Sequence, residues 1–145
     1  MNLRRIPISG WKRCVHSCAV FDSEGEFHAA DLLDKSAAVE WWLRNDPSIF
    51  KISTPAGDFE PDFLYSAKRG SSDVFGILEI KGGIFWNGPD SLARIKSGAA
   101  RKWVASVNRN SAQKWEYAIA LDVDALSANS LEELRRNALE IEPKS

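Results

Sequence analysis

The spacing of apolar residues predicts a helix near the start of the chain, over residues 24–36. Phe27, Ala30 and Leu33 recur at intervals of three, so they lie along one helical face. Ser23 and Glu26 stand three residues apart just before this stripe, the spacing of a capping box in which each side chain bonds the other residue's backbone amide. The helix is therefore expected to begin at about residue 24.

Further along the chain, apolar, aromatic and β-branched residues run through short segments typical of strands. Residues 59–66 and 74–81 are predicted as two strands, and the polar residues 68–73 between them as a loop, so that the three form a hairpin. Residues 50–54 are a further predicted strand, because proline and glycine follow them. Residues 36–46 fit a helix or a strand equally well.

The rest of the pattern predicts a helix, a strand and a second helix. The expected elements are a helix from Asp90 or Ser91 to about residue 107, a buried strand at 115–121 and a short helix at 131–139. Helices that alternate with strands in this order indicate an α/β fold, in which helices cover both faces of a mixed β-sheet.

Length and composition fit one domain that spans all 145 residues. We expect a basic extension at 1–20, a core at about 21–122 and a carboxy-terminal helix at about 130–140. No apolar run approaches the roughly 20 residues that span a bilayer, and no secretory signal is recognisable, so a cytoplasmic location is expected. Cys14 and Cys18 are accordingly expected to be free thiols.

Charge is segregated along the chain although the net charge is only −1. Residues 1–20 and 91–115 contain basic residues and no acidic ones, whereas acidic residues gather at 21–63 and after 116. Such segregation can arise from ordinary solvated surfaces. It favours a polyanionic partner only if an acidic reaction centre lies between the two basic segments.

The hairpin supplies a candidate for such a centre. If it turns at Gly70–Ser71, Asp62 lies opposite Glu79, and residues directly opposed in an antiparallel pair have Cβ atoms about 4.5–5.5 Å apart. Lys81 points to the same face as Glu79 because side chains alternate along a strand. Two carboxylates so close to each other require a positive partner, and a divalent metal is the usual one. Glu60 lies one step outside this group.

A salt-bridged hairpin with a decorated surface is the alternative interpretation. It fits the pattern poorly, because the neighbours of the charged residues on the same face, Leu64 and Ile77, are apolar.

Pro61-Asp62 followed by Glu79-Ile80-Lys81 resembles the active-site signature of the PD-(D/E)xK nucleases. The segments FDSEGEFHAADLLD, VEWWLRN, FKISTPAGDFEPDF, LEIKG and IKSGAARKWVASVN resemble, in order, the carboxy-terminal endonuclease domain of type III restriction enzyme Res subunits and related helicase-linked restriction endonucleases. The resemblance runs from about Gly10 to Leu121. This chain carries no Walker A loop, so ATP-driven translocation would belong to another chain or to a part absent here, and a helicase/translocase or methyltransferase subunit is a possible partner.

The resemblance implies an αβα restriction-endonuclease-like core and a Mg²⁺-dependent DNA endonuclease of the restriction or phage-defence type, with Mn²⁺ as a possible substitute. It implies that Asp62 and Glu79 bind the metal, that the Ile80 carbonyl completes the protein ligands, and that Lys81 contacts the attacking water or the scissile phosphate. The products would carry a 3′-hydroxyl and a 5′-phosphate. The alternative function is a non-catalytic DNA-binding or assembly module that retains the nuclease fold.

The resemblance also implies an acidic residue on the first helix, and Glu26 matches it, with Glu24 as a competitor. A capping role would explain Glu26 without any metal.

Several basic residues are candidates for DNA contacts. Lys96 lies on an otherwise apolar stripe of the helix predicted at 90–107, so its head either extends to the surface or reaches a phosphate near the metal. Contacts to the DNA backbone are further expected from Arg94, Arg101, Lys102, Lys12 and Arg13. A homodimer would supply the second active site that double-strand cleavage needs.

Overall fold

The computed structural model describes residues 6–82, 92–138 and 140–141. Its main feature is a five-stranded sheet in the order β3-β6-β7-β8-β9, in which β7 and β8 are parallel and the other neighbours antiparallel. The strands of this sheet are β3 (Val39–Arg44), β6 (Phe63–Arg69), β7 (Ser72–Lys81), β8 (Lys114–Leu121) and β9 (Glu140–Ile141).

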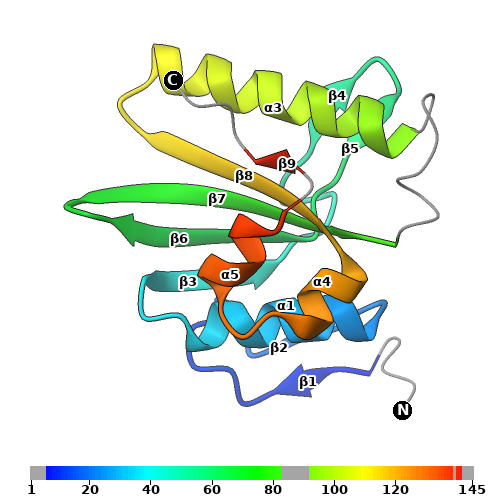
Figure 1. Ribbon diagram of the computed structural model, residues 1–145, viewed down its shortest axis with the longest axis vertical. Helices are drawn as coiled ribbons and strands as arrows, with labels where there is room; N and C mark the ends of the chain where they lie inside the picture. Colours follow the sequence, from blue (N-terminus) through cyan, green and yellow to red (C-terminus); the bar gives the residue numbers. More distant parts are fainter. Residues whose placement is uncertain (1–5, 83–91, 139, 142–145) are drawn as a thin grey trace.

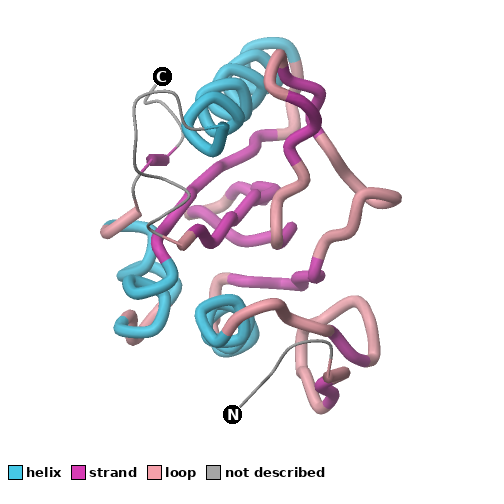
Figure 2. The backbone as a smooth tube through the Cα atoms, turned by 90° about the vertical axis from the view of Figure 1, so that its right-hand side faces the viewer, coloured by secondary structure: helices cyan, strands magenta, loops and turns pink. Residues whose placement is uncertain are grey.

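Helices cover both faces of the sheet, as the sequence predicts (Figures 1 and 2). One face carries α3 (Leu92–Asn110), and the other carries α1 (Glu24–Lys35), α4 (Asp122–Ser127) and α5 (Leu131–Arg136). Two small hairpins lie outside the main sheet, β1 (Ile8–Ser9) with β2 (Cys18–Ala19) and β4 (Ile52–Thr54) with β5 (Gly57–Phe59). None of the helices in the described ranges is long and apolar enough to cross a membrane.

The first helix begins where its cap predicts. The Ser23 hydroxyl accepts a hydrogen bond from the Glu26 amide at 3.1 Å, and the helix runs from Glu24 to Lys35. Ala29, Ala30 and Leu33 are fully buried against the sheet, which anchors the helix through its apolar face.

The β6–β7 hairpin has the predicted register. Phe63 pairs with Leu78 and Arg69 with Ser72, so the turn falls at Gly70–Ser71. Gly70 has a φ of +66°, a conformation that glycine adopts without steric cost.

The predicted boundaries of the hairpin are wrong at both ends. The loop expected at 68–73 is only a two-residue turn, because its polar residues continue the strand ladder. The strand expected at 59–66 is interrupted between β5 and β6, where Pro61 has no amide hydrogen to donate to a ladder. The segment 36–46, which fits a helix or a strand equally well, contains the edge strand β3 at Val39–Arg44.

The carboxy-terminal part differs more from the prediction. The helix expected at 131–139 ends at Arg136, and α4 and β9 were not predicted. No side chain caps the amino terminus of α4, so the usual sequence signal for a helix start is missing. The strand at 114–121 and the helix that continues to Asn110 match the prediction closely, whereas the expected caps Asp90 and Ser91 lie outside the described residues.

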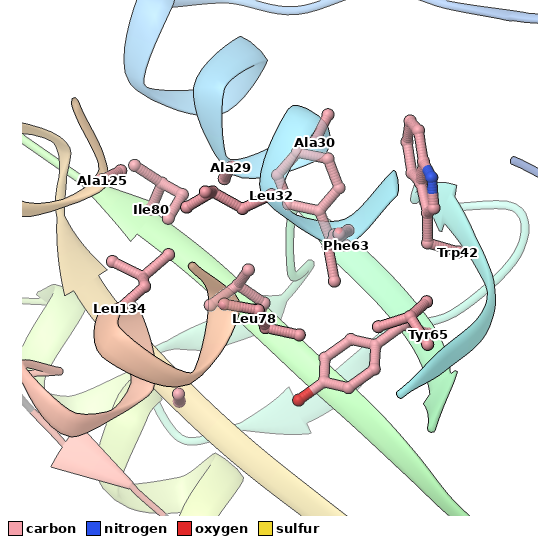
Figure 3. Packing of buried hydrophobic residues seen from close by; sticks show 14 of the residues in the cluster. Ala29, Ala30, Leu32, Trp42, Phe63, Tyr65, Leu78, Ile80, Ala125 and Leu134 are labelled. Atoms are coloured by element: carbon pink, nitrogen blue, oxygen red, sulfur yellow. The ribbon is translucent and has the colours of Figure 1, made fainter. Parts of the chain in front are cut away.

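Two apolar cores hold the layers together. Figure 3 shows the core on the α1 face, where Leu78 and Ile80 of β7 pack toward Ala29 and Leu32 of α1. On the opposite face, Leu64 and Ile77 pack with α3. The hairpin therefore lies in the middle of the molecule, with buried side chains on both faces.

A buried polar cluster links three strands at the turn end of the hairpin. The Tyr65 hydroxyl donates to Glu116, and the Arg69 guanidinium donates to the same carboxylate at 2.7 and 2.9 Å. The Tyr65 ring lies directly over Gly76, its pairing partner on β7. A Cβ atom at Gly76 would therefore come within 2.0 Å of the ring. Glycine is thus required at this position for the ring to reach Glu116.

Replacing Gly76 by alanine should displace the Tyr65 ring and lower the free energy of unfolding by about 1–3 kcal/mol, the usual cost of overpacking a core. Urea unfolding of both proteins measures the change. Gly98→Ala is the control, because no atom lies within 4 Å of its Cβ position and alanine favours helices by up to about 1 kcal/mol. Equal stability of Gly76→Ala and the wild type would contradict the packing described here.

Candidate functional site

Two acidic side chains meet where the hairpin ladder ends. Leu64 and Ile77 point to the α3 face, so Asp62 and Glu79, two residues further along each strand, point to the same face. The last pair of the ladder is Phe63 with Leu78, which places Asp62 level with Glu79, as the turn position predicts.

Hydrogen bonds fix both carboxyl groups against the opposite backbone. The Asp62 amide donates to Glu79 Oε1, and the Ile80 amide donates to Asp62 Oδ2, each at 2.8 Å. Lys81 Nζ lies 2.8 Å from Glu79 Oε2. The structure thus brings Asp62, Glu79 and Lys81 together as predicted.

The two carboxyl groups disturb each other's ionisation because they are close and buried. Burial, with the negative charge of Glu79 and a hydrogen bond between the two groups, raises the pKa of Asp62 well above its ordinary value. Burial, the largest single influence, would lower the pKa of Lys81, but the charge of Glu79 and the hydrogen bond to it, together with the charges of Asp62 and Glu26, raise that pKa overall. Burial and neighbouring carboxyl groups thus set the ionisation of both residues.

Glu26 approaches the same centre from α1. It is 8% exposed, whereas its competitor Glu24 is exposed to solvent. Only half of the predicted capping box forms: Ser23 accepts from the Glu26 amide, while the Glu26 carboxylate lies 3.4 Å from the Asp22 amide and 2.8 Å from Arg44 Nη2. Burial, followed by the charge of Asp62, raises the pKa of Glu26 to about 7.

Arg44 is the part of the site that the sequence analysis missed. Its guanidinium lies 2.8 Å from Glu26, 3.5 Å from Asp62 Oδ1 and 3.5 Å from Asp22. A sequence signal existed, because Arg44 ends the otherwise apolar run Trp41 to Leu43, and a cation there needs an acidic partner.

The carboxylates fit a hard divalent cation. No three His, Cys, Asp or Glu side chains within the described ranges are grouped closely enough to hold a metal. Magnesium, however, is commonly bound by one or two carboxylates and completes its shell with water and phosphate oxygens. Asp62 and Glu79 supply two such groups in contact with each other. The Ile80 carbonyl faces the same side as its amide, which points at Asp62.

An open pocket of about 380 Å³ adjoins the acidic centre. Asp62 and Arg44 line it together with Asp22 and Glu60. Glu60, which the sequence analysis set apart from the centre, is exposed at this pocket. The remaining lining residues are Val20, Asn45, Asp46, Pro47 and Pro61.

The basic residues of α3 separate into two groups. Arg94, Arg101 and Lys102 line one groove of about 660 Å³ together with Pro55. Lys96 is half-buried, and its Nζ lies 4.0 Å from the Cβ position of Gly57 in β5. The helix thus presents three of its four candidate DNA contacts on one surface.

Lys12 and Arg13 lie elsewhere. Their amides donate to the Asp34 carboxylate at 2.8–3.1 Å, and the Arg13 guanidinium bonds the Ser36 carbonyl. Asp34 and Glu26 are eight residues apart on α1, about 12 Å at 1.5 Å per residue. The structure does not bring Lys12 or Arg13 to the acidic centre.

Comparison with known proteins identifies the family. A family model described as an endonuclease domain matches residues 12–119, which include the acidic centre, the hairpin and α3. No curated protein and no solved structure matches the chain significantly. The mixed sheet between helices agrees with a restriction-endonuclease-like fold. Because the match covers well over half of its length, the chain belongs to the endonuclease-domain family.

Proposed function

We propose that this protein is a Mg²⁺-dependent DNA endonuclease that hydrolyses phosphodiester bonds in restriction or phage defence. The convergence of Asp62, Glu79 and Lys81 at the end of the β6–β7 hairpin carries the proposal. Family membership indicates a nuclease, and the chemistry of the three side chains suggests how it would act. The closer resemblance to type III Res subunits and a cytoplasmic location stay predictions.

Each residue of the centre has a distinct role in this mechanism. Asp62 and Glu79 would hold Mg²⁺ with the Ile80 carbonyl, and Glu26, which shares Arg44 with Asp62, would be a further acidic group beside them. Magnesium, when bound, would supply Lewis-acid chemistry that lowers the pKa of a water molecule and offsets the phosphate charge. Lys81 would orient that water and donate to the phosphate oxygens on which negative charge develops. Cleavage would leave a 3′-hydroxyl and a 5′-phosphate.

The groove on α3 suggests how DNA would be held. Arg94, Arg101 and Lys102 would contact backbone phosphates, which fix the position of the duplex without reading its sequence. Lys96, at the β5 side of the helix, remains a candidate for a phosphate nearer the centre. One centre cuts one strand, so double-strand cleavage would need a second copy of the protein, a second visit or a partner. We propose a homodimer as the second copy, and a translocase or methyltransferase subunit as a further partner.

Lys81→Ala should lower the nicking rate of supercoiled plasmid about 10²–10³-fold, because one charge-stabilising donor is lost. Agarose gels with Mg²⁺ or Mn²⁺ measure the rate. Lys68→Ala is the matched control, since Lys68 forms an exposed ion pair with Asp73 at the other end of the hairpin. The proposal fails if the wild type cuts under neither metal, or if Lys81→Ala cuts as fast as the control.

Asp62→Asn should abolish the rise in melting temperature that Mn²⁺ causes in the wild type, because binding to the native state alone stabilises it. Without metal the variant should be at least as stable as the wild type, since one of two apposed buried carboxylates is gone. Differential scanning fluorimetry with EDTA or Mn²⁺ measures both effects. Asp73 is an exposed acid at the turn end of the hairpin, so the control Asp73→Asn should keep the rise in melting temperature with Mn²⁺. An equal rise in Asp62→Asn would refute Asp62 as a metal ligand.

Lys102→Ala should weaken binding to a short DNA duplex and reduce the dependence of log affinity on log salt by about 0.9, the value for one phosphate contact. Fluorescence anisotropy in EDTA over a series of KCl concentrations measures the slope without cleavage. Lys35→Ala removes an exposed lysine from α1, on the opposite face, and should leave the slope unchanged. Identical slopes for the two variants would exclude this groove as the DNA track.

A further inference from the structure

Arg44 lies beside three acidic side chains of the centre, those of Glu26, Asp62 and Asp22. It is the last residue of β3 and pairs with Phe63, the first residue of β6. Its side chain is 17% exposed, and its guanidinium carbon lies 5.7 Å from the centre of the Phe63 ring. The arginine is thus held at the edge of the sheet, beside Asp62.

The guanidinium connects α1 with the start of β6. One terminal nitrogen, Nη2, contacts Glu26 at 2.8 Å, while Nη1 donates to the Asp62 carbonyl at 2.9 Å. Nη1 also lies 3.5 Å from the Asp62 carboxylate. A planar guanidinium can hold two partners in fixed directions, whereas an ammonium is a single point of charge.

The neighbouring Asn45 secures the same stretch of backbone. Its backbone amide donates to the Asp62 carbonyl at 2.8 Å, and its side-chain Nδ2 donates to the Pro61 carbonyl at 2.9 Å. Asp62 lies beyond the last pair of the β6–β7 ladder, so no regular strand pairing with β7 fixes its backbone. Arg44 and Asn45 provide the donors that hold its carbonyl from the β3 side.

We propose that Arg44 is a positioning residue that holds Glu26 and the Asp62 backbone in the geometry needed for cleavage. This inference rests on the proposed nuclease function and concerns how its site is built. Arg44 acts through the two acids and touches no reacting atom. Without it, Glu26 and Asp62 would lose the one guanidinium that contacts both of them, and the Asp62 carbonyl would lose one of its two donors.

The first test measures position in the metal-free protein. Arg44→Met keeps a flexible apolar stem against Phe63 but removes every donor. Amide hydrogen exchange should become faster at Asp62 and Ile80, whose amides donate to the two carboxylates, while the ladder from Phe63 to Ala67 stays protected. Unchanged exchange at Asp62 and Ile80 would overturn the proposal.

The second test measures catalysis. In Arg44→Met the single-turnover cleavage rate should fall about 10–100-fold, the usual effect of a residue that orients a metal ligand, with little change in DNA affinity in EDTA. Arg44→Lys should recover part of the rate, because an ammonium restores the positive charge but not the planar fork that directs one nitrogen at Glu26 and the other at the Asp62 carbonyl. In a Glu26→Gln background, Arg44→Met should cost less than in the wild type, because the two residues act as a unit.

Arg69→Met is the matched control, because Arg69 holds the buried Glu116 at the other end of the hairpin. It should lower stability without lowering the cleavage rate of the folded protein. Arg44→Lys and Arg69→Lys serve as milder versions if either methionine variant fails to fold. If Arg44→Met and Arg69→Met lose the same fraction of cleavage, or if the two lysine variants do, the role of Arg44 is merely structural. A wild type that cuts no DNA overturns both proposals, whereas equal cutting by wild type and Arg44→Met overturns this one alone.

Discussion

The candidate site depends on a close approach of two buried carboxyl groups, Asp62 and Glu79, at the end of one antiparallel hairpin. Like charges directly opposite each other destabilise a sheet, so this pair requires compensation. The backbone compensates in part: each carboxyl group accepts an amide from the opposite strand at 2.8 Å. Lys81 neutralises one charge on Glu79. Burial, followed by the remaining repulsion from Glu79, raises the pKa of Asp62.

The fold around this pair serves to hold it at a fixed place in a rigid layer. Apolar side chains of the hairpin are buried on both faces of the sheet, against α1 on one side and α3 on the other. At the turn end, the Tyr65 ring over Gly76 and the buried Glu116 cluster lock the same two strands. The register that brings Asp62 level with Glu79 is therefore secured along the whole hairpin, because a slip by one residue would send every buried side chain to the opposite face.

Local signals in the sequence predicted the parts of the structure that local interactions determine. The turn at Gly70–Ser71 sets the register of the hairpin, and the Ser23 cap sets the start of α1, so both could be derived before the structure. The predicted strand at 59–66 was wrong because tertiary contacts from Asn45 hold the chain around Pro61 outside the ladder. Helix α4 has no side-chain cap, so the usual sequence signal for its start was missing.

Arg44 was missed for a related reason. It is 18 residues from Asp62 and also 18 from Glu26 in the sequence, and no spacing rule connects positions so far apart. Only the pairing of β3 with β6 brings it to the acidic centre. Sequence spacing was also insufficient for the basic residues. Helical spacing placed Lys96 on an apolar stripe, whereas the residues of α3 that are buried are Ser97, Ala100 and Val104.

Two basic side chains contact the acidic groups of the centre from different directions. Arg44 lies within 2.8–3.5 Å of Glu26, Asp62 and Asp22, whereas Lys81 lies 2.8 Å from Glu79. Burial, followed by the charges of neighbouring carboxyl groups, raises the pKa of Glu26 to about 7 and that of Asp62 well above its ordinary value. Arg44 therefore joins the acid of α1, Glu26, to Asp62, while Lys81 holds Glu79 from the far side, so that the two basic residues together fix the place where the hairpin brings two carboxyl groups side by side.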